Sequence, residues 1–290
     1  MLSIFTPTYN RANTLPRLFK SLCNQTDKDF EWIVVDDGSE DDTASLVHAW
    51  QKDSPFPIIY QYQPNGGKHR AINRGLSIAK GELFFIVDSD DYIIPNAVEI
   101  ILSDWDRVKE SGLCGISYLR GYDENSVIGD VFPKNDYVDN FIEVRFNQNI
   151  RGDKAEVWVT EYLKEYPFPE FDGEKFLGES WLWIRVSRQH DMLWRNKIIY
   201  ITEYLEGGLS KSGRKLRIQC PLGGIEMSLS AVDNMFSLKQ RAKMTCLYLI
   251  YSFFAHKSLK QIISRGSKLL NLILLPAGYF LYIFWLYKYL

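Results

Sequence analysis

Short apolar runs alternate with amphipathic helical patterns over the first 120 residues of this 290-residue chain. Between the runs, apolar residues recur every three or four positions, the spacing that favours a helix. This alternation predicts an α/β fold in which a parallel sheet is covered by helices on both faces, with right-handed crossovers. The runs expected to form strands are 2–5, 30–35, 58–63, 83–87 and 114–118.

Each of the first four expected strands is followed by a loop that carries polar groups. Residues 6–11 combine a tyrosine with an arginine, and residues 36–39 bring two aspartates and a glycine. Residues 65–68 place a lysine after two glycines, and residues 88–91 hold three aspartates. Because parallel strands present their carboxyl ends at one edge of a sheet, where open α/β sheets bind ligands, these loops should converge on one site.

Asp88, Asp90 and Asp91 lie within four positions at the end of an apolar strand. Carboxylates this close repel one another. Their usual neutraliser is a hard divalent cation, which takes oxygen ligands and leaves positions open for substrate phosphates. The stretch therefore predicts a metal and diphosphate site. The alternative is an acidic turn whose side chains only cap the following helix.

The other loops suit a nucleotide. The ring of Tyr9 could stack on a base, the guanidinium of Arg11 could pair with a pyrophosphate, and Lys68 comes at a helix start, where phosphate binds well. A surface tyrosine and a solvated arginine are the commoner fates of such residues, and Asp36 could serve only in a helix cap. Neither the G-x-x-x-x-G-K-[ST] nor the G-x-G-x-x-G spacing is present, which argues against an NTPase or a dehydrogenase.

Residues 6–11, 34–39, 65–73 and 88–91, in this order and spacing, resemble the successive signatures of family 2 glycosyltransferases of the GT-A fold. The resemblance covers about residues 1–205. It implies a Rossmann-like, mixed but mostly parallel sheet flanked by helices. It also implies an inverting transfer of sugar from a nucleotide sugar, most often UDP-linked, to a saccharide or lipid-linked acceptor, as in bacterial surface-polysaccharide synthesis.

The resemblance also assigns roles to single residues. Asp90 is the implied direct ligand of Mn²⁺ or Mg²⁺, and Asp88 is its partner in the D-x-D motif. The metal would stabilise the leaving diphosphate while a carboxylate base takes the proton of the acceptor hydroxyl. The implied contacts of the nucleotide sugar are Thr6, Tyr9, Arg11, Asp36, Lys68, Asn73, Asp88 and Ser89.

In many family members the base belongs to a Glu-Asp pair that opens a tryptophan-rich helix. Residues 176–183 have this setting, but Ser180 stands where the second acid would be. We favour Glu179 as the catalytic base, because backbone N–H groups at a helix start keep a carboxylate ionised. Asp172 and Glu174 remain alternatives, and Glu179 could instead only cap the helix.

The chain changes character near residue 232. Residues 233–290 contain eight Lys or Arg against one Asp, in a chain whose net charge is −2, so a basic tail follows an acidic body. We expect a catalytic domain over 1–231, with a nucleotide-binding half (1–119) and an acceptor-binding half (120–231). A helical, membrane-associating extension is expected over 232–290.

Residues 269–287 carry no charged side chain. Their length approaches that of a membrane-spanning helix, but Pro276 lies in the middle and Asn271 near the start. We favour a membrane-surface or re-entrant segment over a full span. A helix packed on the catalytic body is the alternative.

The region between the nucleotide loops and the tail is less regular. Residues 120–152 read as a long loop, because Gly, Asp, Asn and aromatic residues follow no period. Helices are expected over 154–164 and from Gly178, and a strand over 197–205.

Composition narrows location and partners. Four scattered cysteines fit a reducing cytoplasm, and no signal-peptide pattern opens the chain, so we expect a cytoplasmic protein at the inner face of the cell membrane. The acidic body argues against nucleic acid as a partner, and a homo-oligomer is compatible with the sequence. Alternative functions are a sugar-phosphate nucleotidylyltransferase and a non-catalytic nucleotide-sugar-binding protein. The first would show a glycine-rich loop after strand one, and residues 6–13 contain no glycine.

Overall fold

The computed structural model describes residues 1–202 and 209–289, and the chain divides into two compact units. The first unit comprises Met1–Asn140, Ile150–Pro167 and Val186–Tyr204. The second unit comprises Phe141–Asn149, Phe168–Arg185 and Leu205–Leu290.

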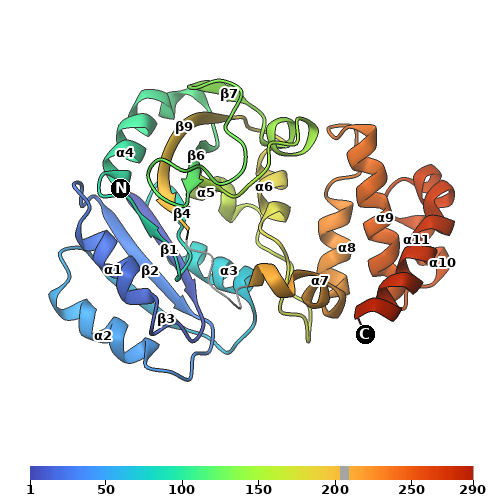
Figure 1. Cartoon of the computed structure of the whole chain (residues 1–290), viewed down its shortest axis with the longest axis horizontal. Helices are drawn as coiled ribbons and strands as arrows, with labels where there is room; N and C mark the ends of the chain where they lie inside the picture. The colour runs from blue at the N-terminus through green and yellow to red at the C-terminus, as the bar shows by residue number, and fades with distance from the viewer. Residues whose placement is uncertain (203–208, 290) are drawn as a thin grey trace. The chain divides into compact units, whose positions relative to one another are not determined.

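The first unit is built on a nine-stranded sheet (Figure 1). Its first four strands, β3-β2-β1-β4 in spatial order, are parallel, so their carboxyl ends share one edge, as predicted. The other half is mixed: β8 runs antiparallel to β4 and β6, β6 is parallel to β9, and β5 and β7 are antiparallel to β9. The strands are β1 (Leu2–Thr8), β2 (Phe30–Asp36), β3 (Ile58–Tyr62), β4 (Leu83–Ile86), β5 (Tyr92–Ile93), β6 (Gly115–Gly121), β7 (Tyr137–Asp139), β8 (Lys154–Val159) and β9 (Met192–Ile201).

Helices cover both faces of this sheet. Apolar side chains of α1, α2 and α4 pack with one face in a single buried cluster. On β1, Phe5 meets α3 at Gly75, where an added Cβ would lie 2.3 Å from the ring, so only glycine allows this approach. The prediction of a mixed α/β sheet flanked by helices is confirmed. The helices of this unit are α1 (Leu15–Cys23), α2 (Thr43–Asp53), α3 (Lys68–Ile78), α4 (Ala97–Val108), the short 3₁₀ turn η1 (Lys109–Ser111) and α5 (Thr160–Lys164).

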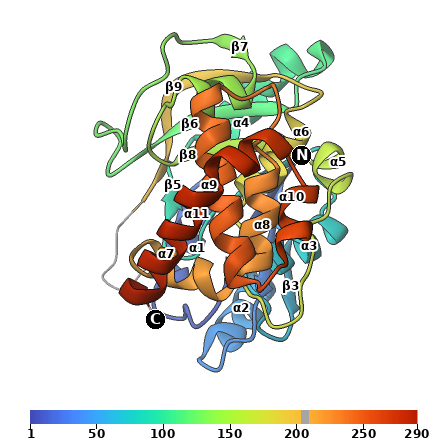
Figure 2. The same cartoon turned by 90° about the vertical axis from the view of Figure 1, so that its right-hand side faces the viewer.

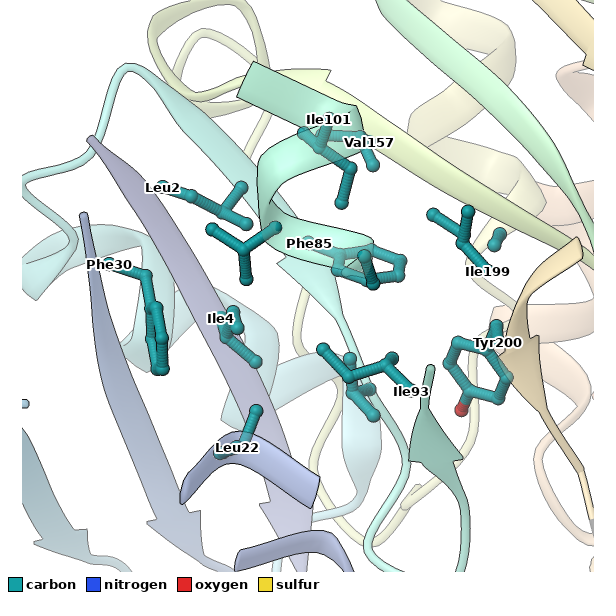
Figure 3. Packing of buried hydrophobic residues seen from close by; sticks show 14 of the residues in the cluster. Leu2, Ile4, Leu22, Phe30, Phe85, Ile93, Ile101, Val157, Ile199 and Tyr200 are labelled. Carbon is teal, nitrogen blue, oxygen red and sulfur yellow. The ribbon is translucent and has the colours of Figure 1, made fainter. Parts of the chain in front are cut away.

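The main core lies between the sheet and the helices α1, α2 and α4. Figure 3 shows residues from strands and helices far apart in the sequence meeting there, including Leu2, Phe85 and Tyr200. Leu2 and Phe85 are fully buried. Burial of this kind contributes roughly 1.5–3 kcal/mol for each large apolar side chain, so the cluster holds the strand ends, and with them the polar loops, in fixed positions.

Three expectations about the middle of the chain need correction. The helix expected over 154–164 is wrong, because residues 154–159 form β8 and only Thr160–Lys164 is helical. Pairing with both β4 and β6 outweighs any local helical preference. The loop expected over 120–152 contains β7 and a π-helical turn, η2 (Glu143–Asn147). The strand expected over 197–205 begins earlier, at Met192, and residues 203–205 lie outside the described residues.

The second unit is mostly helical (Figure 2). Its longest helices, α9 and α11, pack closely, since a Cβ added at Gly278 would lie 2.7 Å from Cβ of Leu249. Ring contacts continue the packing, such as that between Tyr251 and Trp285, whose centroids are 6.1 Å apart. The helices are α6 (Ser180–Val186), α7 (Leu209–Gln219), α8 (Pro221–Leu229), α9 (Leu238–Phe254), α10 (Leu259–Ser264) and α11 (Lys268–Tyr289).

Helix α11 is continuous through Pro276. With 22 residues and a mean hydropathy of 1.9, it is the one helix among the described residues that is long and apolar enough to cross a membrane. Only 17% of its apolar window is buried. Its exposed large apolar side chains are Leu269, Leu272, Ile273, Tyr279, Phe280, Ile283, Phe284, Leu286 and Tyr287.

Candidate active site

The loop after β1 is fastened to the loop after β2. Asn10 adopts a left-handed backbone conformation, with φ of 51°. Its N–H donates to Ser39 Oγ at 2.8 Å, and its side-chain oxygen accepts from the N–H of Glu40 at 2.8 Å. Tyr9, the residue before this anchor, is 48% exposed. The loop thus presents an aromatic ring from a fixed backbone, as base stacking requires.

Thr6 and Asp36 have less access to a ligand. Thr6 is fully buried, and its hydroxyl accepts from Trp32 Nε1 at 2.9 Å. Asp36 is also fully buried and accepts from the Ser39 N–H and the Tyr60 hydroxyl, both at 2.7 Å. In this structure both side chains organise the strand ends. A carboxylate keeps further lone pairs, so Asp36 can still accept from a nucleotide.

Asp37, which sequence reasoning did not single out, joins the loops after β2 and β3. Its carboxylate accepts from the N–H groups of Gly66 and Gly67 at 2.8 and 2.7 Å, and from Gln63 Nε2 at 2.7 Å. Gly67 needs its φ of +94° to begin α3. This turn places Lys68 in the first turn of α3 and Asn73, half-buried, one turn further along. The sequence signal that could have found Asp37 is the pair of adjacent aspartates at 36–37 together with the pair of adjacent glycines at 66–67.

Asp88 lies between two cations. Its carboxylate pairs with Lys68 Nζ at 2.5 Å and with Arg120 Nη1 at 3.5 Å. Burial raises the pKa of Asp88, but the charges of Lys68 and Arg120 outweigh it and bring the pKa to about 2. Asp88 is therefore ionised throughout the physiological range.

Asp91 is the more deeply buried acid of this loop, at 4% exposure. Tyr200 donates to its Oδ2 at 2.7 Å, and Arg120 lies 3.6 Å from the same oxygen. Burial, reinforced by the charge of Asp88, raises the pKa of Asp91 to about 7. Arg120 also stacks 3.9 Å above the Tyr200 ring. Sequence reasoning missed Arg120 and Tyr200, because they reach the acidic loop from β6 and β9, far along the chain.

Asp90 is about as open as Asp88, with side chains 25% and 26% exposed. The carboxylate of Asp90 lies 3.5 Å from Arg11 Nη2. Arg17 on α1 donates a hydrogen bond to the backbone carbonyl of Asp90, and its guanidinium stacks on the Tyr92 ring. These contacts fix the backbone of the loop. Ser89 is buried, at 6% exposure. The structure thus brings Arg11, Lys68, Asp88 and Asp90 together at the carboxyl edge of the sheet.

The comparisons with known proteins agree with this geometry. Residues 3–153, just over half of the chain, match the model of glycosyl transferase family 2. The chain is a family 2 glycosyltransferase. It is 32% identical over 190 residues to the GalNAc(5)-diNAcBac-PP-undecaprenol β-1,3-glucosyltransferase of Campylobacter jejuni, covering 57% of this chain and 60% of that protein.

Other relatives of this glycosyltransferase match over shorter stretches. The chondroitin synthase of Pasteurella multocida is 39% identical over 105 residues, which are 36% of this chain and 11% of the relative. An uncharacterized glycosyltransferase of Rickettsia bellii is 32% identical over 145 residues, 46% of this chain and 20% of the relative. The chain thus spans less than two thirds of the length of these relatives.

Solved structures confirm the GT-A fold of this glycosyltransferase. The structure of residues 1–349 of S. aureus TarS in complex with UDP-GlcNAc superposes with a TM-score of 0.66 at 20% identity, covering 87% of this chain and 72% of that one. The mannosyltransferase PcManGT of Pyrobaculum calidifontis, in complex with GDP-Man and Mn²⁺, gives a TM-score of 0.60 at 18% identity, covering 96% of this chain and 79% of that one.

The donor set of the glycosyltransferase fits a hard divalent ion. Over residues 1–202 and 209–289, no three His, Cys, Asp or Glu side chains gather into a complete metal cage. Asp88 and Asp90 instead offer carboxylate oxygens beside the cations Arg11 and Lys68. This set suits Mg²⁺ or Mn²⁺, which bind proteins through one or two carboxylates and take further ligands from substrate phosphates.

The candidate bases of the glycosyltransferase belong to the second unit. Glu179 is half-buried at the start of α6, where its carbonyl accepts from the N–H groups of Leu182 and Trp183 at 2.9 and 3.3 Å. Glu174 is 8% exposed and caps α8, since its carboxylate accepts from the N–H groups of Leu222 and Gly223 at 2.7 and 2.8 Å. Asp172 is exposed.

Proposed function

We propose that this glycosyltransferase moves a sugar from a nucleotide sugar, with UDP-linked donors favoured, to a hydroxyl of a saccharide or lipid-linked acceptor, with inversion at the anomeric carbon. The observation that carries the proposal is the pairing of Asp88 with Lys68 and of Asp90 with Arg11 at the carboxyl edge of the sheet. Two acids and two cations at this edge match the charges of a metal diphosphate.

The nucleotide would bind over the first three loops. Tyr9 offers the exposed ring for the base, and Asp36, held by Ser39 and Tyr60, offers acceptors for base N–H or ribose hydroxyl groups. Arg11 and Lys68 would pair with diphosphate oxygens. Asn73 is carried by the same helix as Lys68. Thr6 and Ser89, both buried, would act by fixing the loop backbones.

Asp90, with Asp88 beside it, would hold the Mn²⁺ or Mg²⁺ ion. When bound, such an ion supplies charge stabilisation to the leaving diphosphate. Arg11 and Lys68 face the same acids and would balance the remaining negative charge. The Mn²⁺ in the solved complex of the mannosyltransferase PcManGT supports this choice of ion.

Glu179 would be the general base. The acceptor oxygen forms a bond to the anomeric carbon, the bond from that carbon to the diphosphate oxygen breaks, and the hydroxyl proton passes to the carboxylate. Glu174 is committed to two N–H groups of α8, which disfavours Glu174 as the base.

The second unit would hold the enzyme at the cytoplasmic face of a membrane. Helix α11 exposes a row of large apolar side chains, and residues 233–290 carry a basic excess. An apolar helix beside cations suits a surface of anionic lipid. The undecaprenol-linked acceptor named for the Campylobacter relative is compatible with such a location.

A donor screen tests this function. Purified protein is mixed with UDP-, GDP- and dTDP-sugars with and without Mn²⁺, and release of the nucleoside diphosphate is measured. We expect metal-dependent release from one class of donor, lost in Asp90→Asn and retained in the control Asp106→Asn, an exposed acid on α4. Pyrophosphate release from UTP and a sugar phosphate, without transfer from any nucleotide sugar, would contradict the proposal.

A further inference from the structure

A cavity of about 230 Å³ lies within the helical second unit, between α8, α9 and α10. Two cations line it, Lys257 and Arg265, together with the hydroxyl-bearing residues Tyr248, Ser252 and Ser264. Its volume is below the roughly 300–1,000 Å³ of pockets for drug-sized ligands. The cavity is therefore suited to a small anionic group and not to a whole nucleotide.

The backbone around Lys257 is fixed by short-range contacts. After α9 ends at Phe254, His256 adopts a left-handed conformation with φ of 52°, and the N–H of Lys257 donates to the Ser252 carbonyl at 3.0 Å. Ser258 then opens α10 with a capping box completed by Gln261. The turn holds the cation-bearing residue at the cavity without a ligand.

The charges at the cavity leave an excess of one cation. Arg265 pairs with Glu226 at 2.8 Å, whereas Lys257 forms no ion pair with any residue that the structure describes. Ser252 is 1% exposed, and over the described parts of the chain its Oγ meets no partner at hydrogen-bond geometry. A buried hydroxyl and an unpaired ammonium together could donate to an oxyanion that enters the cavity.

We propose that this cavity binds a phosphate group, carried by a lipid at the membrane surface. Arg265 lies three residues before α11, whose first turns expose Leu269, Leu272 and Ile273 at 68, 55 and 61%. Apolar surface that follows a basic pocket along the chain suits a lipid, with its phosphate held by cations and its chains against the helix. None of the residues that line the cavity belongs to the sheet-edge loops assigned to the nucleotide sugar.

Vesicle binding by the full chain tests the proposal. Phosphatidylcholine vesicles contain either phosphatidic acid or the same fraction of oleate, which carries negative charge without phosphate. We expect tighter binding to phosphatidic acid, and about a five-fold loss in Lys257→Gln, given the usual effect of one lysine at an anionic membrane. Lys243→Gln is the matched control, an exposed lysine of α9 that does not line the cavity, and we expect a smaller loss there.

Equal binding to phosphatidic acid and oleate, or equal losses in Lys257→Gln and Lys243→Gln, would overturn the proposal, since only diffuse charge would then act. Thermal shift with inorganic phosphate separates the two sources of the ligand. Stabilisation by inorganic phosphate that Lys257→Gln removes, without any preference among vesicles, would support phosphate binding and contradict the lipid source. No nucleotide sugar is present in either assay, so these results are independent of the proposed transfer reaction.

Discussion

The hydroxyl of Tyr200 donates a 2.7 Å hydrogen bond to Oδ2 of Asp91, 109 residues earlier in the chain. The same hydroxyl accepts from the N–H of Asp88 at 2.9 Å, so one phenol on β9 fixes both ends of the acidic loop. The D-x-D motif is therefore positioned by the mixed half of the sheet as well as by its own strand.

Tyr200→Phe should loosen this loop. The change leaves the buried carboxylate of Asp91 and the N–H of Asp88 without their shared partner, which costs about 1–3 kcal/mol of unfolding free energy. Affinity for the nucleoside diphosphate with Mn²⁺ should fall as well, because the Asp88 backbone is no longer held. Urea unfolding and calorimetric titration measure the two effects. Tyr62→Phe, at a tyrosine that is 56% exposed, should change neither.

Glu179→Gln should lower kcat, whereas Glu174→Gln should mainly lower the stability of the fold. Loss of a general base lowers kcat by about 10²–10⁴-fold, and we expect this for Glu179→Gln with an unchanged melting temperature and donor affinity. Glu174→Gln removes the charge that caps α8 and should cost about 0.5–2 kcal/mol of stability, with a smaller effect on kcat. Full activity of Glu179→Gln would assign the base to another acid.

Lys154 is 1% exposed, and its ammonium donates to the carbonyls of Ile128, Asp130 and Arg151 at 3.3, 2.8 and 2.9 Å. Lys154→Met keeps the apolar stem but leaves these carbonyls without their donor, so we expect a loss of about 1–3 kcal/mol. Hydrogen exchange should speed up over residues 121–139. Lys134→Met, at an exposed position, is the control. Equal exchange in both variants would show that the hydrogen bonds of Lys154 do not hold this segment.

Alkaline solution should destabilise the fold. Burial raises the pKa of the Cys114 thiol, and burial together with Asp104 raises the pKa of Tyr118. Above the ordinary values of 9.0 and 10.0, the unfolded chain loses protons that the folded chain keeps, so stability falls as pH rises. Urea midpoints measured from pH 8 upward should therefore decline, and the decline should be shallower in Cys114→Ala. Midpoints that stay level to pH 11 would contradict this account.

The exposed apolar face of α11 should determine how much of the protein is recovered with the membrane fraction. Leu272→Lys with Phe280→Lys places two charges among its outward apolar side chains, where lipid contact would make them costly. We expect the fraction in the membrane pellet to fall several-fold after cell lysis. Asn234→Lys, at an exposed position outside the helix, controls for added charge. An unchanged distribution of the double variant between pellet and supernatant would contradict membrane association through α11.

The convergence of the nucleotide loops could be predicted because it follows from local patterns. Four short apolar runs with helices between them predict a parallel sheet. In such a sheet the loops that carry Asp88 and Lys68 lie at the same edge. The ion pairs among these residues depend on side-chain geometry, yet their proximity needs only strand order.

The partners from the other half of the sheet could not be predicted. Arg120 and Tyr200 reach the acidic loop through pairing of β6 with β9, which no local signal encodes. The strand β8 was mistaken for a helix for the same reason, since its insertion between β4 and β6 is a long-range event. Lys154 also breaks the rule that lysine stays at the surface, because three carbonyls satisfy its ammonium.

The buried cluster of Ile142, Ile184, Ala231, Phe236 and Met244 joins two short internal segments to the C-terminal helices. Gln240 adds a hydrogen bond to the carbonyl of Phe146 at 2.8 Å. The helix that follows Glu179 therefore packs as one unit with the C-terminal region. A recombination event that exchanged this region for that of another family member would have to carry matching residues at 142 and 184, or leave the proposed base on an unsupported segment.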